Sequence, residues 1–235
     1  MEHDHSRNHP DSHSRNHPDS HSRGQEQFTQ DFWDDRYGSA GQLWSGQPNL
    51  QLVAQVADLT PGDALDAGCG EGGDAVWLAA AGWHVTAVDV SAVAMARGAH
   101  QAAVAGPQIA ARITWQREDL LTWDPGPGRF DLVSAQFMHL PMPVIKEVHR
   151  RLAAAVRPGG TLVIVSHHPD DLPADHRANH AGAFRLAEEI AADLDPADWE
   201  IIVADAIGRI ASGRLAEVVG DGAQVRDTVL RARRR

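Results

Sequence analysis

The sequence predicts an α/β fold, in which a doubly wound parallel sheet carries helices on both faces. Two observations support this prediction: five strand-like runs alternate with helix-like segments between residues 64 and 166, and a glycine-rich turn follows the first run. Such alternation favours parallel strands joined by right-handed crossovers. With 235 residues and 43% hydrophobic content, the chain has enough apolar side chains for one substantial core.

Residues 1–26 differ in composition from the rest of the chain. The octapeptide HSRNHPDS at 5–12 recurs at 13–20, and six of the 14 histidines lie in this segment. Because it lacks the aliphatic residues that would offset its ordering entropy, we expect a disordered His-rich repeat tail. Its histidines can bind zinc, nickel or copper ions, and a solubilising leader without function is the simpler interpretation. No metal site is predicted in the rest of the chain.

Residues 27–60 are rich in aromatic side chains, and we expect them to form N-terminal lid helices of a single domain over residues 27–235. Phe28, Phe32 and Trp33 share one helical face before Gly38 and Gly41 interrupt the helix. A second helix is expected at residues 48–58, and TPGD at 60–63 predicts a turn into the first strand.

The alternating part of the chain predicts strands at residues 64–67, 84–90, 113–118, 130–135 and 161–166, and helices at 73–81, 92–105 and 144–156. Ser91 precedes the second of these helices and is a favourable N-cap. A loop at 167–182 and a helix at 187–194 then lead to two further strand-like runs, 199–210 and 223–233. A Gly-rich connection without a long helix joins these two runs, which predicts an antiparallel pair at the sheet edge.

Charge and cysteine content exclude several classes of protein. A formal charge of -11 and a pI of about 5.6 argue against nucleic acid or anionic membrane as a partner. The single cysteine, Cys69, cannot form an internal disulfide and suits a reducing compartment. We find neither an apolar run of about 18 residues nor the apolar region of a signal peptide. We therefore expect a cytoplasmic monomer or homodimer.

The glycines at 68, 70 and 73 fit the G-x-G-x-x-G spacing of nucleotide-binding turns, which is a weak signal by itself. A turn that merely packs a helix on a strand is the alternative. Asp89, at the end of the second strand, can accept both hydroxyl hydrogens of a ribose, as NAD and S-adenosylmethionine sites both require. Because the carboxyl ends of parallel strands meet at one edge, we expect six residues to converge there. They are Asp66, Gly68, Gly70, Asp89, Asp119 and Gln136.

The charge of the loop separates these two ligands. Asp66, Glu71 and Asp74 would repel the pyrophosphate of a dinucleotide, whereas they favour the ammonium and sulfonium of S-adenosylmethionine. The aromatic residues of 27–60 offer faces that can accept a cation. Asp119 can accept a hydrogen bond from the exocyclic amine of adenine. The residues thus favour S-adenosylmethionine over NAD.

Four segments in order carry a family resemblance: LDAGCGEGGDAVWLAAAGWHVTAVDVS, REDLLTW, FDLVSAQFMHLP and VRPGGTLVIVSHHP. Together they resemble the successive motifs of class I S-adenosylmethionine-dependent methyltransferases, over about residues 28–235. The segment FWDDRYGSAGQLWSGQPN is similar to the lid helix of small bacterial tellurite-resistance and thiopurine methyltransferases. The resemblance implies a Rossmann-like, seven-stranded sheet whose last strand is antiparallel. The His-rich repeat is not part of the family pattern.

The resemblance also implies roles for individual residues. Asp66, Gly68, Cys69, Gly70 and Glu71 would hold the methionyl part of the donor, Asp89 and Val90 the ribose and adenine, and Asp119 and Leu120 the adenine. Gln136 would lie near the methyl donor. Nothing in the pattern makes Cys69 a nucleophile.

Two further hypotheses concern the lid and a base. Trp33, Arg36, Tyr37 and Trp44 would close over the donor, although such aromatic residues also serve simply to pack a helix on a sheet. His139 and His167 with His168 follow the fourth and fifth strands, where a general base would meet the acceptor. The alternative is that these histidines cap helices or hydrogen-bond loops.

The leading functional hypothesis is transfer of a methyl group to a heteroatom of a small-molecule acceptor. An NAD(P)-dependent oxidoreductase is disfavoured by the acidic loop and by the lack of a recognisable Ser, Tyr and Lys set, since Lys146 is the only lysine. A non-catalytic protein that binds the donor or a metal is the third alternative. The sequence does not identify the acceptor.

Overall fold

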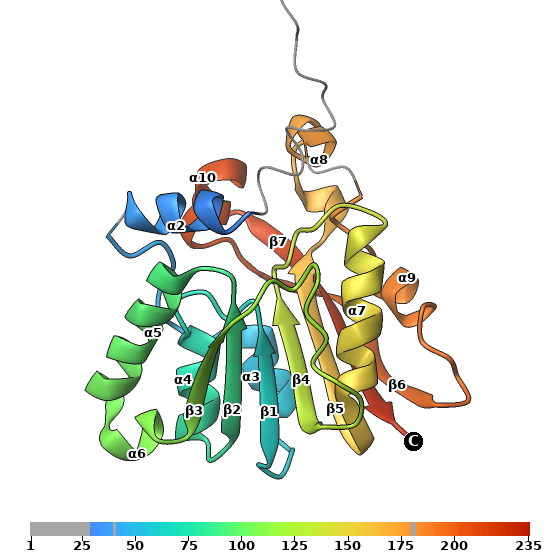
Figure 1. Ribbon diagram of the computed structural model, residues 1–235. Helices are drawn as coiled ribbons and strands as arrows, with labels where there is room; N and C mark the ends of the chain where they lie inside the picture. The colour runs from blue at the N-terminus through green and yellow to red at the C-terminus, as the bar shows by residue number, and fades with distance from the viewer. Residues whose placement is uncertain (1–28, 40, 180–181) are drawn as a thin grey trace, which may run out of the picture.

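The computed structural model describes residues 29–39, 41–179 and 182–235, and one seven-stranded sheet organises them (Figure 1). The strand order is β3-β2-β1-β4-β5-β7-β6. The strands are β1 (Asp63–Ala67), β2 (His84–Asp89), β3 (Ile113–Arg117), β4 (Phe130–Gln136), β5 (Val156–His167), β6 (Trp199–Ile210) and β7 (Gln224–Arg234).

Strands β1 to β5 pair in parallel, and β7 pairs antiparallel with both β5 and β6. The predicted seven-stranded, mostly parallel sheet with an antiparallel last strand is therefore confirmed. The late strands form an antiparallel pair as expected, and β7 inserts between β5 and β6, which leaves β6 at the edge.

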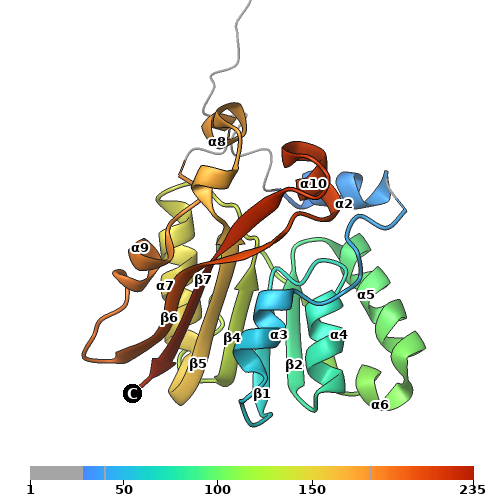
Figure 2. The ribbon, with the colours of Figure 1, turned by 180° about the vertical axis from the view of Figure 1, so that it is seen from behind.

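The helices lie on both faces of the sheet, as Figures 1 and 2 show from opposite sides. They are α2 (Gln30–Gly38), α3 (Leu50–Val56), α4 (Gly73–Ala80), α5 (Ala92–Ala105), α6 (Pro107–Ala110), α7 (Val144–Ala155), α8 (Ala174–Asn179), α9 (Ala187–Ala191) and α10 (Gly213–Val219), with a short 3-10 helix, η1 (Pro169–Asp171). Within these described residues, no helix is both long enough and apolar enough to cross a membrane.

The two apolar layers follow from the alternation of side chains along β5. Leu162 and Ile164 face the layer that contains α7 and α9, whereas Val163 and Val165 face the layer that contains α3 and α4. Since β5 is covered on both faces, it reads in the sequence as a continuous apolar run. Ser91 caps α5 as predicted, because its hydroxyl accepts a hydrogen bond from the Ala94 amide at 3.2 Å.

Several boundaries differ from the prediction. The strand expected to begin at residue 161 begins at Val156, because its first residue already pairs with Phe130. The Gly-rich connection between the last two strands contains α10, whose Leu215 packs with Leu172 and Val225. That helix depends on contacts distant in sequence, which a local pattern does not reveal. The helix expected at 187–194 ends at Ala191.

The connection between β3 and β4, residues 118–129, contains no helix along its described length.

The carboxyl ends of the parallel strands lie beneath α2 and α10, which are side by side in both views (Figures 1 and 2). The prediction of a disordered tail over residues 1–26 lies outside the described residues.

Candidate active site

The glycine-rich loop at the end of β1 is the centre of the site. Gly68, Gly70 and Gly72 all have positive φ, of 74°, 52° and 79°, a conformation that glycine adopts without steric cost. A Cβ on Gly70 would lie 3.0 Å from the hydroxyl oxygen of Tyr37, so the loop also needs glycine for space. The amides of Gly68 and Cys69 donate to the Val88 carbonyl, at 2.8 and 2.9 Å, and thereby fix the loop against β2.

Asp89 faces this loop from the end of β2, as the strand order predicted. Its Oδ2 accepts a hydrogen bond from the Gly70 amide at 2.8 Å, and its Oδ1 accepts one from the Ser91 amide at 2.9 Å. Burial raises the pKa of this carboxyl. A carboxylate has about four acceptor positions, so Asp89 retains acceptor capacity for a ligand hydroxyl. Its neighbour Val90 is half-buried directly after β2.

Asp66 is the most desolvated acid of the loop. It is 1% exposed, and its Oδ2 has no hydrogen-bond partner in the part of the chain that the structure describes. Burial, together with the nearby charges of Asp74 and Asp89, raises its pKa well above the usual range. Burial likewise raises the pKa of the Cys69 thiol. A cationic ligand group beside Asp66 would relieve this crowding of acids.

Glu71 is engaged by the protein itself. Its Oε2 accepts hydrogen bonds from the amides of Leu43 and Trp44, at 3.1 and 2.9 Å, and its Oε1 lies 2.8 Å from Nη1 of Arg97. With 2% exposure, this carboxylate joins the N-terminal segment to the loop and to α5. Arg97 strengthens the same junction by donating to the Tyr37 carbonyl at 2.7 Å. That Glu71 contacts a ligand stays a prediction.

The N-terminal aromatic residues lie against the glycine loop to different degrees. Tyr37 is buried, and its hydroxyl accepts a hydrogen bond from Trp44 Nε1 at 2.9 Å. Burial raises the pKa of the Tyr37 hydroxyl. The ring of Trp33 lies 6.0 Å from that of Tyr37 and 5.5 Å from the guanidinium carbon of Arg36. Burial and the charge of Arg214 on α10 lower the pKa of Arg36.

The predicted residues after β3 and β4 have contrasting environments. Asp119 is exposed, and its Oδ1 accepts from the Leu121 amide at 2.9 Å within a turn. Leu120 lies at the loop, because its Cδ1 is 3.9 Å from the position of a Cβ on Gly68. The amide oxygen and nitrogen of Gln136 are both buried, and neither has a hydrogen-bond partner among residues 29–39, 41–179 and 182–235.

The two predicted base residues meet in one aromatic cluster. The rings of His139 and His167 stack with centroids 5.0 Å apart, and Phe137 stacks on His167 at 4.3 Å. Phe184 lies 4.8 Å from His139. His168 is not part of this cluster: its Nδ1 accepts from the Asp170 amide at 3.3 Å and caps η1, which is the alternative that the sequence left open.

Sequence reasoning missed two charged residues beside this cluster. Asp227 of β7 is 1% exposed, its Oδ1 lies 3.8 Å from Nδ1 of His167, and its Oδ2 accepts from Arg209 Nε at 2.6 Å. The available signal was an acid at an inward-facing position of a buried strand. A buried acid of this kind requires a charged or hydrogen-bonding partner.

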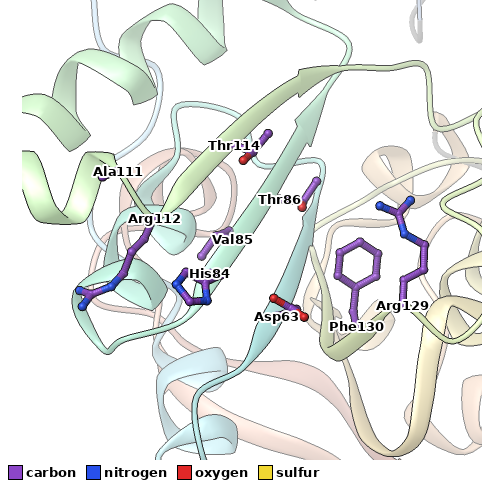
Figure 3. Close-up of a pocket in the computed structure, with 9 residues that line it drawn as sticks. All are labelled: Asp63, His84, Val85, Thr86, Ala111, Arg112, Thr114, Arg129 and Phe130. Atoms are coloured by element: carbon purple, nitrogen blue, oxygen red, sulfur yellow. The ribbon is translucent and has the colours of Figure 1, made fainter.

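Two surface cavities among the described residues lie away from this site. One, of about 430 Å³, is bordered by α7 and α9. The other, of about 360 Å³, lies at the amino ends of β1 to β4, where Thr86 and Thr114 stand between Arg112 and Arg129 (Figure 3). This second cavity borders Arg129, the last residue of the connection between β3 and β4, which contains no helix along its described length.

Comparisons with known proteins agree with the fold. A sequence family described as "Methyltransferase domain" matches residues 64–160. Malonyl-[acyl-carrier protein] O-methyltransferase of Pseudescherichia vulneris is 33% identical over 174 residues, which are 67% of this chain and 64% of that protein. Ribosomal RNA small subunit methyltransferase C of Alcanivorax borkumensis is 38% identical over 134 residues, 54% of this chain and 39% of that protein. The chain thus spans less than two thirds of these relatives.

Solved structures show the same architecture at low identity. A structure described for the conversion of a disulfide bond into a thioacetal group during echinomycin biosynthesis has a TM-score of 0.66 and 24% identity, and covers 87% of this chain and 91% of its own. TehB from Haemophilus influenzae has a TM-score of 0.62 and 17% identity, and covers 88% of this chain and 67% of its own. At these identities the likeness concerns the fold alone.

Proposed function

We propose that this chain, which belongs to the class I S-adenosylmethionine-dependent methyltransferase family, transfers a methyl group from S-adenosylmethionine to a heteroatom of a small-molecule acceptor. The observation that carries the proposal is Oδ2 of the Asp66 carboxylate beside the glycine loop, which is buried and has no hydrogen-bond partner among the residues that the structure describes. This oxygen is a suitable acceptor for the donor's ammonium group, whereas a pyrophosphate would add negative charge beside an acidic loop.

The residues around the loop fit the parts of the donor. Asp66 would hold the ammonium, and Gly68 and Gly70 give the backbone space for the methionyl part. Asp89 would accept the ribose hydroxyl hydrogens. Leu120 offers an apolar contact for the adenine, with Asp119 and Val90 beside it. Gln136 would place its free amide near the reacting methyl group.

The N-terminal segment would exclude water from the donor. Trp33, Tyr37 and Trp44 provide aromatic faces, and the hydrogen bond from Trp44 to Tyr37 holds two of them against Gly70. Arg36 would lie near the donor carboxylate. The two amide contacts of Glu71 keep this lid attached to the loop.

When bound, S-adenosylmethionine supplies an electrophilic methyl group that a nucleophile displaces in line. The chain's own contribution is to hold donor and acceptor in that line and to remove a proton from an acceptor that carries one. His139 follows β4 and His167 is the last residue of β5, at the same edge as the loop, and both would serve as bases for the acceptor. The net charge of -11 favours a small molecule over nucleic acid as the acceptor.

Calorimetric titration of the full chain with S-adenosylmethionine, S-adenosylhomocysteine and NADH tests the donor. We expect micromolar affinity for both sulfur ligands and none for NADH. In Asp89→Ala the affinity should fall at least about tenfold, because charged hydrogen bonds to the ribose are lost. Asp205→Asn, an exposed acid on β6, is the control and should bind as the wild type does. Binding of NADH alone would refute the proposal.

A further inference from the structure

We propose that Asp227 is a positioning residue for His167. Its carboxylate, held by Arg209, would accept a hydrogen bond from Nδ1–H of His167, so that Nε2 is left without a hydrogen and can take a proton from the acceptor. The acceptor would then carry a proton on its reacting atom, as a hydroxyl group does. This inference deepens the proposed function and rests on it.

The strand pairing brings the three side chains together. His167 is directly opposite Asp227 in the antiparallel ladder of β5 and β7, so their side chains lie on the same face of the sheet. Ile207 is opposite Asp227 in the ladder of β6 and β7, and Arg209 lies two residues further on that face. The trio is therefore fixed by backbone register and not by loops.

The contacts of Asp227 leave one oxygen for His167. Arg209 Nε donates to Oδ2 at 2.6 Å, which fixes the carboxylate and its charge. Oδ1 is 3.8 Å from Nδ1 of His167, and throughout the described structure neither of these two buried atoms has a hydrogen-bond partner. Catalytic hydrogen bonds are often long in the absence of ligand and shorten when a ligand binds. We therefore expect these two atoms to form a hydrogen bond when the acceptor is bound.

Aromatic stacking holds the imidazole plane of His167. Phe137 lies on it at 4.3 Å with an interplanar angle of 30°, and the Arg209 guanidinium carbon lies 5.8 Å from the Phe137 ring. Phe137 is followed by Met138, whose Cε is 3.5 Å from the position of a Cβ on Gly68. The segment after β4 thus contacts the glycine loop with one residue and His167 with the preceding one.

The proton transfer balances charge as well as atoms. The O–H bond of the acceptor breaks, the proton moves to Nε2 of His167, and the oxygen electron pair forms the new bond to the methyl carbon. The bond from that carbon to sulfur breaks and leaves its electron pair on sulfur. Positive charge consequently moves from the sulfonium to the imidazolium, where Asp227 stabilises it. A thiolate acceptor would need no such base.

Asp227→Asn is an informative change because Arg209 remains. The guanidinium only donates, so it would keep the amide oxygen, and the amide nitrogen would then donate to Nδ1 of His167. The neutral imidazole would consequently carry its hydrogen on Nε2, which cannot accept a proton.

The experiment is nitrogen NMR of the histidine side chains in the full chain, above the pH at which imidazole is charged. We expect wild-type His167 to carry its hydrogen on Nδ1. In Asp227→Asn, the Nδ1 signal should become that of a nitrogen without hydrogen, and the Nε2 signal that of a nitrogen with hydrogen. His139 should keep its pattern. Asp205→Asn, the same change at an exposed position of β6, should leave His167 as in the wild type.

A wild-type His167 with its hydrogen on Nε2, or one whose tautomer does not respond to Asp227→Asn, would overturn the proposal. The wild-type spectrum alone can give the first of these results, so the test survives a variant that fails to fold. Calorimetry with S-adenosylmethionine separates this inference from the proposed function. Affinity within about twofold of wild type in Asp227→Asn is expected, whereas no binding by the wild type would reject the donor and leave the tautomer result standing.

Discussion

The two ends of the sheet handle their polar groups differently. At the amino ends, Arg157 bridges Asp63 and Asp131 at 3.1 Å each, while Arg112 and Arg129 donate to the backbone carbonyls of Ala79 and Pro125. At the carboxyl ends, buried polar atoms lack partners among the residues that the structure describes. They belong to Asp66, Gln136, His167 and Asp227.

The comparison shows that the cavity at the amino ends and the candidate site lie at opposite ends of the sheet. The amino ends border a cavity of about 360 Å³, and there Arg157 pairs with both Asp63 and Asp131. The carboxyl ends instead keep groups that the described residues leave unsatisfied, which cost stability unless a ligand satisfies them. The candidate site therefore coincides with unsatisfied buried groups of the described residues and not with this cavity.

The largest expected effect is on donor affinity in Asp66→Asn. Loss of a charged hydrogen bond is worth about 2 to 3 kcal/mol, or roughly 30- to 150-fold in affinity for S-adenosylmethionine. Because Oδ2 of the wild-type carboxyl is buried and has no partner among the described residues, this variant should unfold at no lower temperature than wild type. Calorimetry and thermal denaturation measure both quantities.

Asp131→Asn is the matched change at the amino ends. It should lower the free energy of unfolding by about 1 kcal/mol, since Arg157 loses a partner, and leave donor affinity unchanged. Equal loss of affinity in both variants would break the comparison between the two ends.

Glu71→Gln should have the next largest effect, and on stability. Its buried carboxylate accepts two amides and pairs with Arg97, so we expect a loss of about 2 kcal/mol in the free energy of unfolding. Asp63→Asn removes a half-exposed pair at the other end and should cost less than about 0.5 kcal/mol. Urea denaturation distinguishes the two, and equal losses would contradict the difference in burial.

The pH dependence of stability should reveal Asp74. Burial raises its pKa from 3.8 to about 6, so the folded state binds a proton that the unfolded state releases. Its contribution is therefore favourable below the unfolded value and is lost as the pH rises through about 6. Relative to Asp74→Asn, the wild-type melting temperature should decrease as the pH is raised from 3.8 to about 6. Parallel curves for the two proteins would refute this.

The smallest expected effect concerns the lid. Trp44→Phe keeps an aromatic face but removes the hydrogen bond to Tyr37, and should weaken donor binding about twofold to threefold. Trp44→Ala and Arg36→Ala should each weaken it about fivefold, because aromatic or charge contacts with the donor are lost. Unchanged affinity in both alanine variants would mean that these side chains only pack the helix.

The strand ends were the part of the site that the sequence could predict. Alternating apolar runs give the order of β1 to β5, and parallel strands must bring Asp66, Asp89 and Gln136 to one edge. The glycine spacing was less informative: Gly72, and not Gly73, shares the positive φ of Gly68 and Gly70. Gly73 is needed for space instead, because a Cβ there would lie 2.9 Å from the Gln47 carbonyl oxygen.

Partners that belong to different elements could not be predicted. Glu71 is in the glycine loop, and its sequence position suggests a ligand contact. Only the fold shows that Leu43, Trp44 and Arg97 reach its carboxylate. Asp227 lies 60 residues after His167, and only the insertion of β7 beside β5 makes them opposite residues.

The order of synthesis gives the position of β7 a further consequence. A ribosome releases β5 and β6 before residues 224–234, yet these later residues must lie between the two earlier strands. The donor half, β1 to β4, can assemble while translation continues, whereas β6 has no place in the sheet until β7 emerges. His167 therefore meets Asp227 last, after the strands that carry the glycine loop have been synthesised.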